Sequence, residues 1–177
     1  RVHRLRPYLL AGVLALAVVV GADRAGALEA FENDSVDLRF ELRPERTADD
    51  LVVVAIDDVT FSDLGARWPF PRSYFAKAVD RLHEAGAREI VLDVQFTEES
   101  APGEDLALYE AIGRAGGAVL ATSETDGHGG HNIFGGQRNL DPIGAVGAAA
   151  NLPDQDAGVI RRFNDVVDGL PSIAAAV

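Results

Sequence analysis

The stretch "WPFPRSYFAKAVDRLHEAGAREIVLDVQF", Trp68 to Phe96, combines a stiff turn, a helical pattern and an apolar run. Its two prolines fix the backbone of the turn and bias the residues before them towards extended geometry. Ser73 is the expected N-cap of the helix and Gly86 its C-terminal stop. The final "REIVLDVQF" predicts a buried strand. Between turn and strand, apolar residues recur at helical spacing, at Phe75, Ala78, Val79 and Leu82.

A second apolar run lies upstream of the turn. "LVVVAIDD", from Leu51 to Asp58, is continuous in apolar residues until its two aspartates. Such a run is typical of a strand buried on both faces in a parallel sheet. With the helix and strand that follow, it predicts one βαβ unit.

The pattern repeats downstream of Phe96. The segment "AVLATS", Ala118 to Ser123, predicts a third strand, and Gly116 with Gly117 ends the helix before it. That helix is indicated by Leu108, Ala111, Ile112 and Ala115. The two units together predict an α/β fold with a mostly parallel sheet, flanking helices and right-handed crossovers.

The C-terminal part contains more turn signals. We expect the glycine-rich residues 124–139 to form an exposed loop. "GAVGAAANL" (144–152) and "GVIRRFND" (158–165) flank the turn "PDQDAG", which predicts a C-terminal antiparallel hairpin. "LPSIAAAV" (170–177) predicts the start of one more helix, with Pro171 in its first turn.

The N-terminus differs from the rest in charge and hydropathy. Arg1, Arg4 and Arg6 precede the uncharged run Pro7 to Ala22, which predicts a transmembrane helix within a membrane anchor, residues 1–27. A cleaved secretory signal ending at "AGA", residues 25–27, is the alternative. In either case the positive-inside rule places residues 28–177 on the extracytoplasmic side of the cell membrane.

The segment after the anchor, "SVDLRFELRP", alternates apolar and polar residues. The alternation predicts a strand, unless a helix continuing from the anchor overrides it. The apolar positions are Val36, Leu38, Phe40 and Leu42.

Composition narrows the functional classes. The 177 residues are 47% hydrophobic and carry a formal charge of -12, with a pI near 4.6. This acidity argues against nucleic acid as a partner. The absence of cysteine excludes a disulfide framework and a thiolate metal site, and we expect no cofactor because the sequence contains no phosphate loop or dinucleotide fingerprint.

Candidate site residues gather at the predicted carboxyl ends of the strands. Asp57 and Asp93 end two of them, and ligands bind beyond such ends in open α/β sheets. The set can be a structural ion-pair network, a ligand pocket that uses the same side chains, or a divalent metal site at Asp57 and Asp93. The full candidate set is Asp57, Asp58, Trp68, Arg72, Asp93 and Arg161.

Two histidines in "GHGGH" suggest a second place for a metal. His128 and His131 are surrounded by glycine, and no carboxylate partner is evident. A solvated loop is therefore the preferred interpretation.

The order of these motifs resembles the CHASE type-2 (CHASE2) domain, a bacterial extracytoplasmic sensor module. The similar features are the strand ending at Asp57, the Trp68–Arg72 turn, the helix that ends at Ala85-Gly86-Ala87, and the strand end from Asp93 to Phe96. "DQDAGVIRRF" resembles the acidic turn of that family, and the likeness runs from about residue 31 to residue 177. The long glycine-rich loop departs from the family pattern.

The resemblance implies a sensor domain that follows one membrane helix and precedes a cytoplasmic output, commonly a nucleotide cyclase, a histidine kinase or a serine/threonine kinase. It implies no catalytic residue in these 177 residues. The expected partners are the membrane, an unknown small-molecule or environmental signal, and a second copy in a homodimer. Two alternatives stay open: an exported metal-assisted hydrolase that uses Asp57, Asp58 and Asp93, and a structural envelope module without ligand.

Overall fold

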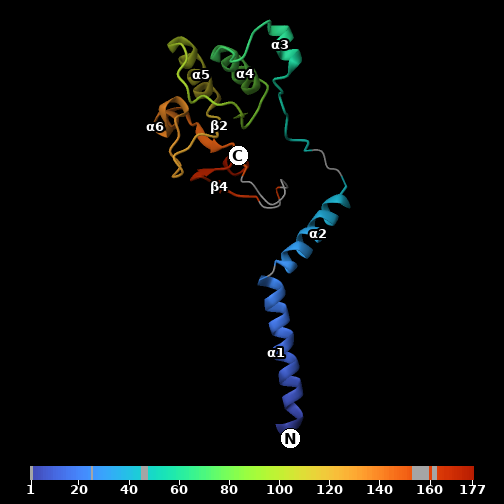
Figure 1. Ribbon diagram of the computed structural model, residues 1–177. Helices are drawn as coiled ribbons and strands as arrows, with labels where there is room; N and C mark the ends of the chain where they lie inside the picture. Colours follow the sequence, from blue (N-terminus) through green and yellow to red (C-terminus); the bar gives the residue numbers. More distant parts are fainter. Residues whose placement is uncertain (1, 25, 45–47, 153–159, 161–162) are drawn as a thin grey trace. The chain divides into compact units, whose positions relative to one another are not determined.

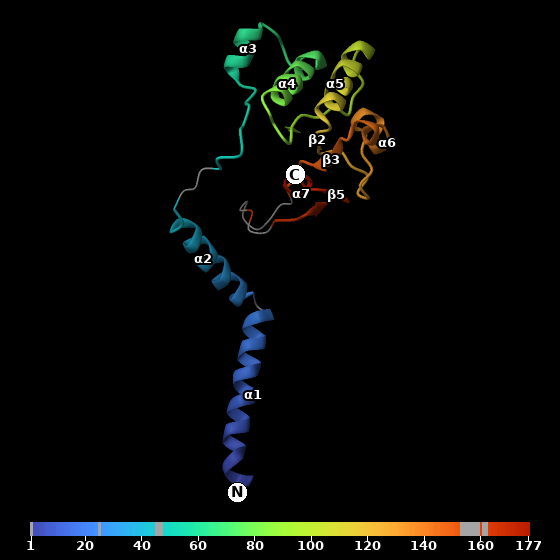
Figure 2. The same ribbon diagram turned by 180° about the vertical axis from the view of Figure 1, so that it is seen from behind.

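The computed structural model describes residues 2–24, 26–44, 48–152, 160 and 163–177. Figures 1 and 2 show the chain from opposite sides. The chain divides into two compact units, Arg1–Val54 and Ala55–Val177, which are described separately below.

The first unit contains two helices, α1 (Val2–Arg24) and α2 (Ala27–Glu41), with Gly26 in the left-handed region at φ 71° between them. Among the described residues no helix has the length and apolarity that a membrane crossing requires. The strand predicted around residues 36–42 is wrong, because these residues belong to α2 and its end. A helix satisfies its backbone groups within the segment, whereas a lone strand does not.

The strand predicted for "LVVVAIDD" is also wrong. Residues 51–57 have no regular secondary structure and are followed by α3 (Asp58–Leu64). Their side chains are exposed, at 82% for Val52 and 79% for Val53. An apolar run forms a strand only when a neighbour pairs with it, and the sheets described in this structure pair other segments.

The second unit is built on a parallel sheet with strand order β1-β2-β3. The strands are β1 (Val91–Leu92), β2 (Val119–Thr122) and β3 (Val146–Ala149). All four residues of the middle strand β2 are buried, as expected of a strand covered on both faces. The parallel α/β prediction is therefore confirmed, with β1 shorter than expected.

Helices α4 (Arg72–Glu84) and α5 (Pro102–Ala115) lie side by side in both views (Figures 1 and 2). Val79 of α4 and Leu108 of α5 are fully buried in one core with Leu120 of β2. Both helices were predicted, but the N-cap of α4 is Pro71 and not Ser73. The backbone N–H of Ser73 instead donates to the side chain of Glu104 on α5, at 2.7 Å.

The segment expected as an exposed loop contributes to the core. It contains η1 (Ile133–Gly135) and α6 (Gln137–Leu140), followed by η2 (Asp141–Ile143). Ile133 is fully buried, and so is Leu140, the first residue after the predicted loop. The prediction is correct only for the part of the loop before residue 131, because two apolar side chains anchor the rest.

The predicted C-terminal hairpin is present, but on other residues. β3 pairs parallel with β2, and the antiparallel pair is β4 (Val166–Val167) with β5 (Leu170–Pro171). Much of "GVIRRFND" lies outside the described residues. The last helix, α7 (Ile173–Ala176), begins after Ser172, so Pro171 belongs to β5 and not to the first turn.

Candidate functional site

Arg72 is the first residue of α4 and is only 8% exposed. Its guanidinium donates to the backbone carbonyl of Glu98, and its Nη1 lies 2.6 Å from Oδ1 of Asp105 on α5. Its Cζ is 5.4 Å from the ring centroids of both Phe96 and Phe134. A carboxylate, a carbonyl and two aromatic faces therefore compensate the arginine for the loss of water.

The turn before Arg72 packs aromatic rings against α4. The Trp68–Pro69 peptide bond is cis. The ring of Trp68 lies edge-on to Phe70 at 5.5 Å and to Phe75 at 6.3 Å, although the residue is 51% exposed. Phe70 belongs to the core. The turn is thus attached to the helix that presents Arg72.

The N-terminal ends of α4 and α5 are joined a second time. Glu104, beside Asp105, accepts the backbone N–H of Ser73. The N–H and the hydroxyl of Ser73 hold the pKa of Glu104 below its usual value, with a smaller contribution from the charge of Lys77. Asp105 also accepts the backbone N–H of Ser100 at 3.1 Å. Two consecutive residues of α4 therefore bind two consecutive acids of α5.

The aspartates proposed from the sequence occupy other positions. Asp57 is the N-cap of α3 and accepts the N–H of Thr60 at 3.0 Å. This bond and the hydroxyl of Thr60 lower the pKa of Asp57. Asp58 lies in the first turn of α3, and Asp93 is an exposed residue after β1.

The structure therefore joins Arg72 to Asp105, an acid that the sequence did not single out, while Trp68 lies in the same turn as Arg72. Arg161 lies outside the described residues. Within the described part of the chain, no group of three or more histidines and acids is arranged to hold a metal ion.

His131 is fixed within the fold and is not part of a solvated loop. Its Nδ1 accepts the N–H of Ile133 at 3.3 Å, which leaves Nε2 to donate to Oε1 of Gln137 at 3.2 Å. The same Gln137 oxygen accepts the N–H of Gly147 in β3, at 3.3 Å. His128 is exposed, as expected of a loop residue.

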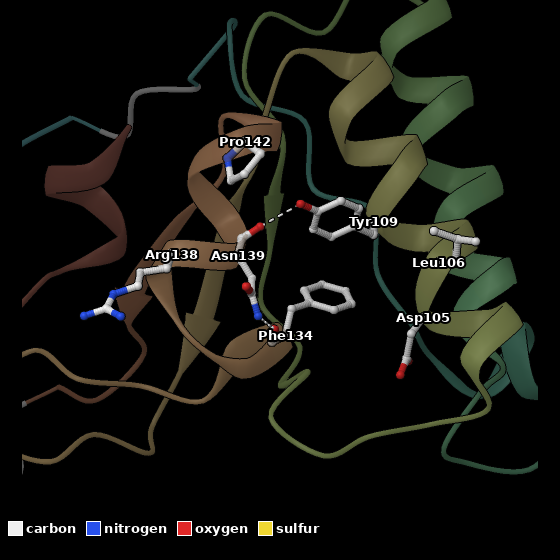
Figure 3. A pocket seen from close by; sticks show the side chains of 7 residues that line it. All are labelled: Asp105, Leu106, Tyr109, Phe134, Arg138, Asn139 and Pro142. Atoms are coloured by element: carbon white, nitrogen blue, oxygen red, sulfur yellow. Dashed lines mark hydrogen bonds between the residues drawn. The ribbon is translucent and has the colours of Figure 1, made fainter.

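A cavity of about 310 Å³ opens between α5 and residues 134–142, and we call it the α5 pocket (Figure 3). The hydroxyl of Tyr109 donates to the backbone carbonyl of Asn139 at 2.8 Å across one wall, and Nδ2 of Asn139 donates to the carbonyl of Phe134 at 2.7 Å. The lining residues are Asp105, Leu106, Tyr109, Phe134, Arg138, Asn139 and Pro142.

Phe134 connects the α5 pocket to Arg72. It lines the pocket, contacts the Tyr109 ring at 6.0 Å and stacks on Phe96 at 6.1 Å. Its backbone has φ 48° and ψ 29°, a left-handed conformation that costs a residue with a side chain about 1 to 2 kcal/mol. Backbone strain of this kind gathers at binding and switch sites. The α5 pocket is therefore a better candidate site than the predicted cluster around Asp57 and Asp93.

Sequence reasoning missed most of this site. In the sequence, Asp105 cannot be distinguished from any other acidic residue in the first turn of a helix. Tyr109 likewise resembles any half-buried helix residue. Phe134 offered a weak signal, because it is a large aromatic residue directly before two glycines in a polar segment.

Comparison with known protein families gives one match, which covers most of the chain. A model of the CHASE2 domain family matches residues 13–177. No curated protein and no solved structure matches the chain. The match includes α2, the Trp68–Arg72 turn and all the residues that line the α5 pocket.

Proposed function

The chain belongs to the CHASE2 family of sensory domains, and on this premise we propose that it is the extracytoplasmic sensory domain of a membrane-bound receptor. The match over residues 13–177 is the observation that carries the proposal. The basic flank and apolar run at residues 1–22 support a membrane anchor on its N-terminal side. The output is a cytoplasmic nucleotide cyclase or protein kinase, and the working unit is a homodimer.

The α5 pocket is the place where the signal molecule binds. Two of its wall residues, Asp105 and Phe134, also contact Arg72. A ligand that moves the Phe134 ring therefore changes the surroundings of Arg72, which contacts α5 and the loop at Glu98. Such a ligand shifts the equilibrium between two arrangements of α4 and α5 by its difference in affinity for them.

A topology reporter tests the membrane placement. An enzyme that is active only outside the cytoplasm, fused after Val177 of this chain, is expected to be active in intact cells. Activity only of a cytoplasmic reporter at the same position would contradict the proposal.

A blocked pocket tests the sensory role in the complete receptor. Leu106 is 54% exposed at the pocket, so Leu106→Trp fills the opening without removing a core side chain. We expect this variant to lose the response of the output to its signal, while Leu64→Trp, at a 45% exposed position on α3, keeps it. An unchanged response in the Leu106 variant would remove the pocket from the signalling route.

A further inference from the structure

Helix α2 exposes apolar side chains along one face. Phe31, Leu38 and Leu42 are each more than half exposed, and Leu42 is the C-cap residue of the helix. Phe40 is exposed on the opposite side. A helix of about 12 to 15 residues is marginally stable in water by itself, and α2 has 15 residues. A partner that covers the apolar face would therefore stabilise α2.

The residues of this face follow the heptad spacing of a coiled coil. Phe31, Ser35, Leu38 and Leu42 are separated by four, three and four positions, which places them alternately at d and a positions. At about 100° per residue they lie within a sector of about 60° around the helix. Ser35 is the polar member, and its hydroxyl already donates to the carbonyl of Glu32 at 2.8 Å. We call these four residues the α2 seam.

The charges that flank the α2 seam distinguish two orientations of a second helix. In this register Asp34 and Glu41 occupy g positions, and Glu32 and Arg39 occupy e positions. A parallel pair joins g residues to e residues, so Asp34 lies beside Arg39 of the partner subunit, twice in the dimer. An antiparallel pair joins g to g, which brings Asp34 to an acid, Glu41. It also joins e to e, and the attraction between Glu32 and Arg39 only offsets that repulsion. Charge therefore favours the parallel pair.

Both members of the favoured ion pair lie at the edge of the α2 seam. Asp34 and Arg39 are exposed. Arg39 donates from Nε to the carbonyl of Ser35 at 3.0 Å and from Nη2 to its hydroxyl at 3.2 Å, so the guanidinium lies against a seam residue. Exposed ion pairs contribute little free energy, but in coiled coils they select the partner and its orientation.

We propose that two copies of this chain pair through their α2 seams as a short parallel coiled coil, with Asp34 of each copy bound to Arg39 of the partner subunit. This inference rests on the proposed membrane-bound homodimer and identifies the interface of that dimer. Anchors at the N-terminal side of both chains place the two α2 helices in the same direction. Attachment to one membrane also raises the effective concentration of the two helices, which a seam of four residues requires.

Single cysteines test the α2 seam, because the chain contains none of its own. Phe31→Cys and Leu38→Cys lie seven residues, or about 10 Å, apart along the helix. Each variant of the full chain is oxidised with copper phenanthroline in membranes of the cells that express it. We expect both to form disulfide-linked dimers, because a parallel seam brings equivalent Cβ atoms close together. Asn33→Cys, on the opposite side of α2, is the matched control and is expected to stay monomeric.

Other crosslinking patterns would overturn the inference. Crosslinking of Ser35→Cys without Phe31→Cys and Leu38→Cys would indicate an antiparallel pair, because only the centre of such a seam meets itself. Crosslinking of Asn33→Cys to the same extent as Leu38→Cys would indicate random collision. No crosslinking at any seam position would show that the two faces do not meet.

A charge swap tests the ion pair. On the Leu38→Cys background, Asp34→Arg brings like charges together and is expected to reduce the crosslinked fraction about threefold. Adding Arg39→Asp restores opposite charges and is expected to restore crosslinking, which a general loss of helix stability would not do. A double variant that crosslinks no better than Asp34→Arg alone would overturn the pairing of these two residues.

The outcomes separate this inference from the proposed function. Energy transfer between labelled copies that shows a dimer, while no seam cysteine crosslinks, would refute this interface and leave a homodimeric receptor. A cytoplasmic reporter after Val177 would refute the placement of the receptor whatever α2 pairs with.

Discussion

Nη1 of Arg72 lies 2.6 Å from Oδ1 of Asp105 where α4 and α5 begin, and Nη2 of Arg114 lies 2.8 Å from Oδ2 of Asp80 near their other ends. The two helices therefore run in the same direction, with an arginine–aspartate pair at each end. The pairs differ in burial. The side chains are 10% and 25% exposed in the first pair, but 54% and 36% in the second.

This difference predicts unequal costs for the same substitution. Arg72→Ala leaves Asp105 partly buried without its partner, and we expect it to lower the free energy of unfolding by about 3 kcal/mol. Arg114→Ala removes an exposed pair and is expected to cost less than about 1 kcal/mol. Urea denaturation of both variants measures the difference. Equal losses in the free energy of unfolding would show that burial does not increase the contribution of the first pair to stability.

The bond between Ser73 and Glu104 predicts a pH dependence. Because folding lowers the pKa of Glu104 below its ordinary 4.5, its contribution is complete above pH 4.5 and is lost as the pH falls through the lower value of the folded state. We expect Glu104→Gln to be less stable than the parent at pH 7 and to lose less stability on acidification. Thermal midpoints between about pH 3 and pH 7 measure this, again as a difference between the two proteins. Asp57 and Asp126 also have lowered pKa values. Both residues are present in the parent and in the variant, so their contributions cancel in the difference between the two proteins. Parallel pH profiles of the parent and the variant would show that Glu104 is not a source of the pH dependence.

The left-handed backbone of Phe134 predicts an order of stability between two small replacements. Both Phe134→Ala and Phe134→Gly remove the ring from the pocket and from Arg72. Only glycine adopts φ 48° without steric strain, so the glycine variant is expected to be about 1 kcal/mol more stable than the alanine variant. Chemical denaturation compares them directly. A more stable alanine variant would mean that the conformation relaxes when the ring is removed.

The contact between His131 and β3 predicts that Gly147 tolerates no side chain. A Cβ at Gly147 would lie 2.5 Å from Nε2 of His131, and the ring is held by Ile133 and Gln137. We expect Gly147→Ala to cost about 1 to 3 kcal/mol, as overpacked cores do. Gly103→Ala near the start of α5 meets nothing within 4 Å and is the control, expected to be neutral or slightly stabilising. Equal stability of the two variants would show that the ring moves aside freely.

The parts of the fold that could be predicted are those specified by local pattern. The apolar spacing of α4 and α5, and the glycines that end them, are signals within a few residues of one another. The strand β2 was predictable because a buried strand in a parallel sheet is apolar throughout.

The rest depends on contacts between distant segments. The apolar run at residues 51–56 has the composition of a strand, but no local signal tells whether another strand pairs with it. The partner of Arg72 is 33 residues away, and Asp57 and Asp93 were equally plausible on charge alone. The α5 pocket depends on how residues 134–142 fold back on α5, and the glycines of that segment allow many such paths.

The exposed segment Leu51–Ile56 has a practical consequence for handling this protein. It is rich in β-branched residues, uncharged and free of proline, and Leu51 and Val54 are 69% and 66% exposed. Segments of this composition pair with copies of themselves as intermolecular β-sheet. Concentrated preparations of the chain are therefore expected to aggregate through this segment, and a single Val53→Lys substitution there is expected to raise the solubility limit.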